Sequence, residues 1–149
     1  MKTKANNEVT LAFPSRSSNE GFARAAVSCF AAQMDPTLNE LEDIKTAVSE
    51  AVTNCIVHAY PESVGDIYIW VGLFDDGLVR IRIRDRGCGI ADVRQAMEPL
   101  FTTLGGERAG LGFAVMESFM DKVRVRSAPN RGTSVTMDKL IKGRGDGQS

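Results

Sequence analysis

The sequence predicts an α/β protein, an α+β two-layer sandwich in which helices cover one face of a mostly antiparallel sheet. Two observations favour this class. The periodic patterns follow the order strand, helix, helix, strand, strand, helix, strand, strand, with a glycine-rich stretch before the last helix. The hairpin-linked strands alternate apolar and polar residues, which predicts one buried and one wet face. A chain of 149 residues, 43% hydrophobic, has room for one such domain, expected over residues 1–141.

The N-terminal segment predicts a short strand followed by a helix. Residues 8–13 alternate polar and apolar side chains, and Pro14 then interrupts the pattern. Ser17 and Glu20 have the spacing of a capping box at a helix start. The apolar stripe of this helix is expected to consist of Phe22, Ala26, Cys29 and Phe30.

A second, longer helix is predicted after Asp35-Pro36. Thr37 and Glu40 form another capping box, and the helical pattern runs to about Ala59. Its apolar stripe is expected to contain Leu41, Ile44, Val48, Cys55 and Ala59.

The rest of the chain predicts four strands and two helices. Residues 66–74 and 78–85 form a hairpin around Asp-Asp-Gly, with Arg80, Arg82 and Arg84 expected on the solvent side. A short helix near residues 92–97, a loop over 99–108 and a helix over 110–120 follow. Two strands at 122–126 and 133–139 flank a turn, and residues 142–149 are expected to be a disordered tail.

Composition and cysteine usage exclude several classes of protein. With 18 Lys and Arg against 19 Asp and Glu, there is no bulk basic field for nucleic-acid binding. The three cysteines are widely spaced and predict neither a disulfide framework nor a zinc site. Neither a signal peptide nor an apolar run of about 18 residues is present, so we expect a soluble cytoplasmic protein without a membrane partner.

Three polar residues of the second helix form a candidate site. Glu50, Asn54 and His58 recur at every fourth position and line one strip beside the apolar stripe. A strip next to the core can face a pocket between helix and sheet. An ordinary solvated helix edge explains the same spacing.

Two glycine-rich segments are further candidates. Asp85, Gly87 and Gly89 follow a strand, where a carboxylate can accept hydrogen bonds and glycines let the backbone approach a ligand, although a plain tight turn also fits. Gly110 and Gly112 precede a helical pattern and can present backbone N–H groups to phosphate, with Arg108 nearby as a cation. The Walker pattern and the signatures of eukaryotic-type protein kinases are absent.

Taken together, these segments resemble the nucleotide-binding boxes of the Bergerat-type ATPases, which include gyrase, Hsp90, MutL and histidine kinases. The matching segments are EAVTN, DRGCG and GLG. At finer grain the chain is similar to the sporulation anti-sigma-F factors, a family of serine kinases. That similarity is carried by SEAVTNCIVHAY, RDRGCGI, PLFTT, ERAGLGFAVMESFMD and RGTSVTM.

The resemblance implies a role for each candidate residue and implies ATP and Mg²⁺ as cofactors. Asn54 would be the magnesium ligand, and Glu50 would accept the proton of a partner serine hydroxyl. Asp85 would accept the adenine amino group. The remaining implied contacts with the nucleotide come from Gly87, Gly89 and Thr133 at the base, Gly110 and Gly112 at the phosphates, Arg108 at the γ-phosphoryl group, and His58, whose role is left open between structural and chemical.

The resemblance also implies partners. They are a sigma factor of the sigma-F type and an anti-sigma-factor antagonist that is phosphorylated on serine, and we expect a homodimer. We further expect the first helix, including Arg24, to contribute a partner or dimer surface. Two alternatives remain open: a sister kinase that acts on a general-stress sigma factor, and a non-catalytic adaptor that uses ATP only to bind its sigma factor.

Overall fold

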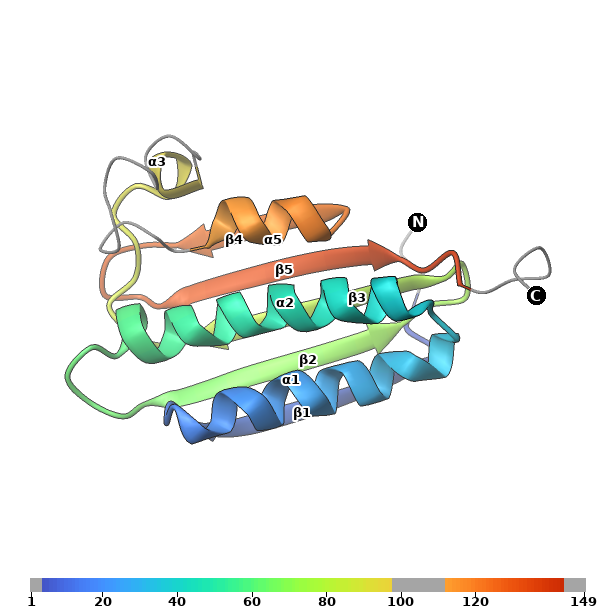
Figure 1. The fold of residues 1–149 in the computed structure, drawn as a ribbon. Helices are drawn as coiled ribbons and strands as arrows, with labels where there is room; N and C mark the ends of the chain where they lie inside the picture. The colour runs from blue at the N-terminus through green and yellow to red at the C-terminus, as the bar shows by residue number, and fades with distance from the viewer. Residues whose placement is uncertain (1–3, 98–111, 144–149) are drawn as a thin grey trace.

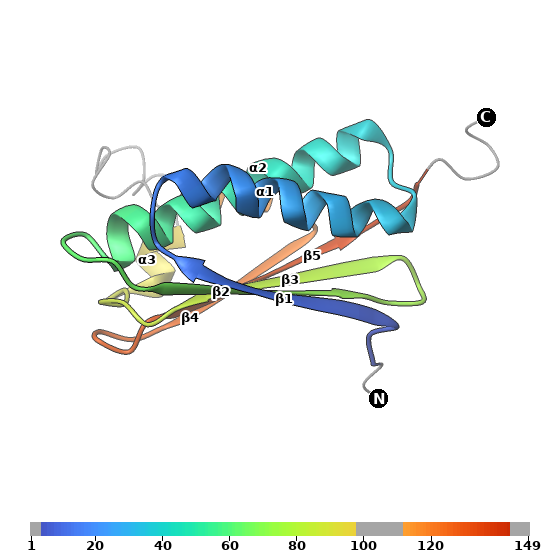
Figure 2. The same cartoon turned by 90° about the horizontal axis from the view of Figure 1, so that it is seen from below.

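The computed structural model describes residues 4–97 and 112–143 as a helical layer on one face of a five-stranded sheet. The strands follow the order β1-β2-β3-β5-β4, and every neighbouring pair is antiparallel. Figure 2 shows the helices on one side of the sheet and the opposite face uncovered. The predicted two-layer sandwich is therefore confirmed.

The described elements largely match the predicted ranges (Figure 1). The strands are β1 Asn7–Pro14, β2 Asp66–Leu73, β3 Leu78–Asp85, β4 Lys122–Ser127 and β5 Thr133–Leu140. The helical elements are α1 Ser18–Ala31, the 3₁₀ turn η1 Ala32–Met34, α2 Leu38–Asn54, the π-helical turn η2 Cys55–Ala59, α3 Val93–Met97 and α5 Phe113–Phe119.

The start and the buried face of α1 differ from the prediction. Ser17 adopts helical backbone angles, so its side chain makes no capping bond, and Glu20 pairs instead with Arg24 and Ser49. The predicted stripe is also wrong by about one residue, since Phe22 is 56% exposed. The residues that face the core are Ala23, Val27, Ser28 and Ala31.

The start of α2 confirms the capping box. Thr37 has an extended backbone, which lets its hydroxyl accept from the Glu40 N–H at 3.1 Å while the Glu40 carboxylate accepts from the Thr37 N–H at 2.9 Å. Regular α-helix ends at Asn54. The last turn widens into η2, in which the Tyr60 N–H donates to the Cys55 carbonyl.

The core lies between the helical layer and the sheet. It is built from the alternate apolar positions of the strands, including Ile67, Ile69, Ile81 and Ile83, and from the inner faces of α1, α2 and α5. The uncovered face of the sheet carries Arg80, Arg82 and Arg84, as predicted. Within the described part of the chain, no helix is both long and apolar enough to cross a membrane.

Candidate nucleotide site

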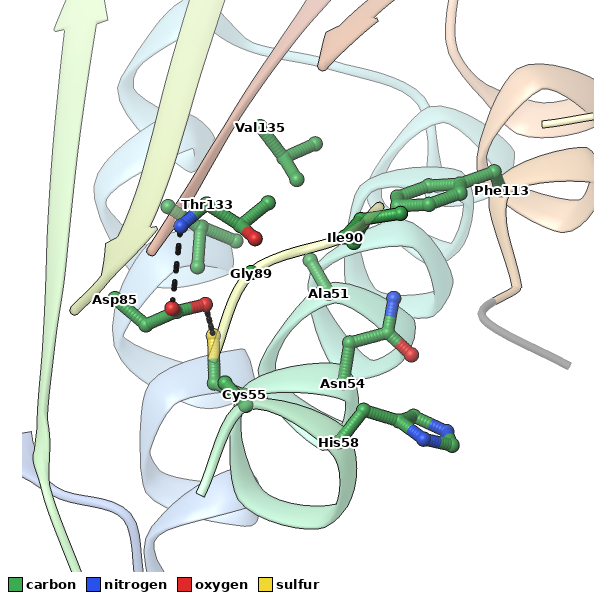
Figure 3. A pocket seen from close by; sticks show the side chains of 12 residues that line it. Ala51, Asn54, Cys55, His58, Asp85, Gly89, Ile90, Phe113, Thr133 and Val135 are labelled. Carbon is green, nitrogen blue, oxygen red and sulfur yellow. Dashed lines mark hydrogen bonds between the residues drawn. The ribbon is translucent and has the colours of Figure 1, made fainter. Parts of the chain in front are cut away.

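A cavity opens at one end of the sandwich, between the end of α2 and the ends of β3 and β5 (Figure 3). It holds about 380 Å³ of space, its open mouth included. Its lining residues are Ala51, Asn54, Cys55, His58, Ala59, Ile83, Asp85, Gly89, Ile90, Phe113, Thr133 and Val135. Five of the residues singled out from the sequence, Asn54, His58, Asp85, Gly89 and Thr133, therefore converge on one cavity.

Asp85 is the buried polar group of this cavity, with only 5% of its surface exposed. One carboxylate oxygen accepts from the backbone N–H of Gly87 at 2.8 Å and of Thr133 at 3.2 Å, and the other accepts from the Cys55 thiol at 3.4 Å. Burial raises the pKa of the Asp85 carboxyl above its ordinary value, and these hydrogen bonds oppose the rise only in part. The carboxylate thus retains lone pairs for a donor group entering the cavity.

The loop after Asp85 is held close to its neighbours by its two glycines. A Cβ on Gly87 would collide with the backbone of Ala59, and Gly89 has a φ of +77° with its α-carbon against the Ala128 carbonyl. The Cys88 N–H donates to the Ala59 carbonyl at 3.1 Å, which ties the loop to η2. Gly87 therefore positions the loop from outside the cavity, whereas Gly89 lines it.

Asn54 and His58 project from the same side of the second helix toward the cavity mouth (Figure 3). Their alignment spans the change from α2 to η2, because Asn54 ends the regular helix and His58 lies in the π turn. The predicted polar strip is thus partly confirmed. Glu50, its first member, is not among the residues that line this cavity.

Glu50 lies beside the cavity and contacts the start of α5. Gly112 precedes α5 with a φ of +71°, and a Cβ on Gly112 would overlap the Glu50 carboxylate. Glu50 also lines a separate surface hollow together with Arg24 and Ser49. The structure therefore brings together Glu50 and Gly112 at the edge of the cavity.

Thr133 faces the cavity from the first position of β5. Its hydroxyl lies 2.8 Å from the Ser127 hydroxyl, which in turn accepts from the Ile90 N–H at 2.8 Å. This chain of hydrogen bonds links β4, β5 and the loop after Asp85. Arg108 and Gly110, the other predicted site residues, lie outside the described residues.

The sequence reasoning missed the apolar walls and the thiol of the cavity. Ile83, Ile90, Phe113 and Val135 supply flat apolar surface, and no polar signature distinguishes them from ordinary core residues. Cys55 was assigned to the core stripe, and it is buried. Its bond to Asp85 depends on a contact between η2 and β3 that helical periodicity does not show.

The side chains around the cavity fit a magnesium ion that is held mainly by the phosphates of a bound nucleotide. Across residues 4–97 and 112–143, no group of three or more His, Cys, Asp or Glu side chains is arranged to hold a metal. Mg²⁺ commonly keeps several waters and binds through one or two protein oxygens together with substrate phosphates. The amide oxygen of Asn54 at the cavity mouth is a metal ligand of that kind.

Comparisons with known proteins identify the family of the chain. Residues 13–139 match the model of the histidine kinase-like ATPase domain. The chain is 56% identical over 137 residues to an anti-sigma F factor of Caldanaerobacter subterraneus, covering 91% of this chain and 95% of that protein. It is 50% identical over 136 residues to an anti-sigma F factor of Geobacillus thermodenitrificans, with coverage of 91% and 93%.

Solved structures share the fold at low sequence identity. The structure of the RsbU and RsbW domains of Rv1364c from Mycobacterium tuberculosis matches 91% of this chain and 32% of that chain, with a TM-score of 0.66 at 20% identity. The histidine kinase domain of the blue-light activated kinase from Erythrobacter litoralis matches 83% of this chain and 60% of that chain, with a TM-score of 0.58 at 17% identity.

Proposed function

The chain belongs to the histidine kinase-like ATPase domain family and, within it, to the anti-sigma F factors. From this premise we propose that it binds Mg-ATP, captures a sigma factor of the sigma-F type, and phosphorylates an anti-sigma-factor antagonist on serine. The observation that carries the proposal is the buried Asp85 carboxylate inside a cavity with Asn54 at its mouth. Beside this cavity, Glu50 contacts Gly112.

The adenine ring is assigned to the inner part of the cavity. The Asp85 carboxylate accepts the amino group of the base, since its remaining lone pairs face the cavity. Ile83, Ile90 and Phe113 provide apolar surface for the ring. Gly89 and Thr133 shape the space around it, and Gly87 keeps the loop close to the second helix.

The phosphates are assigned to the cavity mouth. When bound, Mg-ATP supplies the γ-phosphoryl group and neutralises the charge that develops during its transfer. The amide oxygen of Asn54 holds the ion. Gly110 and Gly112 lie in the segment that contacts the phosphates through backbone N–H groups, and Arg108 stabilises charge on the transferred group.

Glu50 is proposed as the general base. Its position one helical turn before Asn54 places its carboxylate next to the assigned phosphate site and on the hollow that opens to the surface. A serine hydroxyl that enters from that hollow can pass its proton to Glu50 as the oxygen attacks. His58 lies at the same mouth and is assigned a positioning role.

Arg24 supports a partner surface on α1. Its side chain is 43% exposed, pairs with Glu20 and lines the same hollow as Glu50. A partner that contacts Arg24 would therefore approach the proposed base directly. We assign this surface to the protein partners, and we propose that two copies of the chain form a dimer.

The experiment that tests the proposal incubates the protein with Mg-ATP, a purified sigma-F-type sigma factor and a purified antagonist. We expect capture of the sigma factor in the presence of ATP, and phosphoserine on the antagonist by mass spectrometry. Capture of the sigma factor without phosphorylation of the antagonist would indicate a non-catalytic adaptor that uses ATP only to bind its sigma factor. Absence of ATP binding would contradict the proposal as a whole.

The partner surface has its own test. Arg24→Ala should weaken capture of the sigma factor or the antagonist while ATP affinity stays at the wild-type value, because the side chain lies outside the nucleotide cavity. Arg16→Ala is the matched control, since Arg16 is also exposed and lies just before α1. Equal partner binding by the two variants would refute the role of Arg24.

A further inference from the structure

The uncovered face of the sheet carries a concentration of arginines that the nucleotide site does not use. Arg82 and Arg84 project from β3, and Arg124 and Arg126 project from β4. Strand register aligns them in rows, because Arg84 and Arg126 both pair with Ser134, and Arg82 and Arg124 both pair with Thr136. Two facing columns of guanidinium groups therefore run along the sheet with β5 between them.

At the end of these columns lies a second hollow, which adjoins the nucleotide cavity because Asp85 and Thr133 line both. It holds about 750 Å³ of space, its open mouth included. Four arginines line it: Arg84, Arg86, Arg126 and Arg131. We call these four residues the arginine patch.

No ion pair neutralises the arginine patch within the described part of the chain. The only carboxylate of the hollow, Asp85, is buried and bonded to Gly87, Thr133 and Cys55. Four cations around one opening repel one another, so a bound anion would stabilise the arrangement.

The helices on the other face of the sheet carry the opposite charge to the arginine patch. The overall formal charge is −1, yet residues 18–59, which contain α1 and α2, include six acidic and two basic residues. The two faces of the protein therefore carry opposite charge. Such a distribution orients an acidic partner toward the open sheet face and away from the helices.

The aromatic residues of this face argue against nucleic acid as the occupant. Arg84 and Arg86 each lie 5.2 Å from the ring centre of Tyr68, and Arg82 lies 5.3 Å from the Trp70 ring. The ring faces on which single-stranded bases would stack are thus covered by guanidinium groups.

The spacing of the arginines fits an extended polypeptide. Alternate residues of a strand lie about 7 Å apart on one face, and the same repeat separates alternate side chains of an extended peptide. Acidic side chains at alternate positions of a bound segment can therefore meet successive arginines. We propose that the arginine patch and the adjoining Arg82 and Arg124 bind an extended acidic segment of a protein partner.

Peptide binding at the arginine patch does not depend on the proposed function, because none of its four arginines lines the nucleotide cavity. The test measures the fluorescence anisotropy of a labelled oligoglutamate peptide added to the full-length protein at low and high salt. We expect saturable binding that weakens as salt rises. Arg84→Glu/Arg126→Glu should weaken the affinity about tenfold or more.

Two controls keep the result interpretable. Lys4→Glu/Arg16→Glu carries the same change of net charge at exposed positions away from the patch, and it should bind the peptide like the wild type. Arg84→Gln/Arg126→Gln should give an intermediate loss. Thermal unfolding and ATP affinity, measured for each variant, identify any variant that fails to fold.

Three outcomes would overturn the inference. The first is no binding of the peptide by the wild type. The second is an equal loss of affinity in the Lys4→Glu/Arg16→Glu control, which would indicate a general charge effect. The third is tighter binding of a labelled single-stranded oligonucleotide of the same charge than of the peptide, which would assign the patch to nucleic acid.

Discussion

Gly112 lies directly against the carboxylate of Glu50, with a left-handed backbone that leaves no room for a Cβ atom between them. This contact joins the C-terminal end of α2 to the residue that precedes α5. The position of the proposed base therefore depends on a residue that is remote in sequence.

Gly112→Ala should abolish phosphorylation of the antagonist while the protein remains folded. An alanine at this φ is strained by about 1–2 kcal/mol, and its methyl group would displace the Glu50 carboxylate. Phosphate transfer and thermal stability are the two measurements. Gly77→Ala is the matched control, because Gly77 also has a positive φ but lies in the β2–β3 turn. It should lose similar stability and retain activity. Loss of activity in both variants would attribute the effect to backbone strain alone.

Asp85→Asn should lower ATP affinity at least about tenfold and leave the fold intact. The amide oxygen can still accept from Gly87 and Thr133, whereas the new NH₂ group presents a donor to the adenine amino group. Native stability should not fall, because the substitution removes a buried charge. Isothermal titration with ATP and thermal unfolding check the two parts. Wild-type affinity in this variant would remove Asp85 from the base contact.

ATP binding should weaken as pH falls through the native pKa of Asp85, which burial raises above the ordinary 3.8. The protonated carboxyl is a poorer acceptor for the base. Because the Cys55 thiol stabilises the carboxylate, Cys55→Ala should move the midpoint of this loss to higher pH. Titrations of ATP affinity against pH, with circular dichroism to confirm the fold, provide the check. A midpoint that stays unchanged in the variant would show that the thiol does not affect Asp85.

Glu40 should contribute stability that is present at neutral pH and lost in acid. Burial acts to raise the pKa of its carboxyl, but hydrogen bonds from the N–H groups of Thr37, Lys142 and Gly143 outweigh it and hold the pKa below the ordinary 4.5. A lowered native pKa means that stability decreases as pH falls from the unfolded value through the native one. Glu40→Ala should cost about 1–2 kcal/mol at neutral pH by urea unfolding. Glu42→Ala, at an exposed position two residues along, should cost much less, and equal losses would contradict the capping role.

Local sequence rules predict a helix start correctly where the capping residue has the backbone conformation that its side-chain bond requires. The capping box forms at Thr37 because the backbone of Thr37 is extended. Ser17 has helical backbone angles, and its side chain makes no capping hydrogen bond. The predicted apolar stripe of α1 contains the large Phe22, whereas the buried face of the helix contains the small Ala23. Phe22 instead packs edge-on against Phe13 at 6.4 Å and stays largely exposed.

The polar part of the site was predictable, and its apolar part was not. Asn54 and Asp85 carry polar groups at spacings that few structural roles require together. Phe113 and Ile90 look like any core residue until the fold places them around the cavity. No residue pattern in the sequence predicts the π turn after Asn54, because its hydrogen bonds are made by the backbone alone.

We propose that this protein transfers phosphate to a partner serine with Glu50 as the base. The most direct measurement follows the transfer of γ-phosphate from labelled Mg-ATP to a purified antagonist, for wild type and Glu50→Gln, with ATP affinity measured for both. We expect transfer by the wild type, a loss of about 10²-fold or more in the variant, and similar ATP affinities. Transfer by Glu50→Gln at the wild-type rate, or no transfer by a wild type that binds ATP tightly, would contradict it.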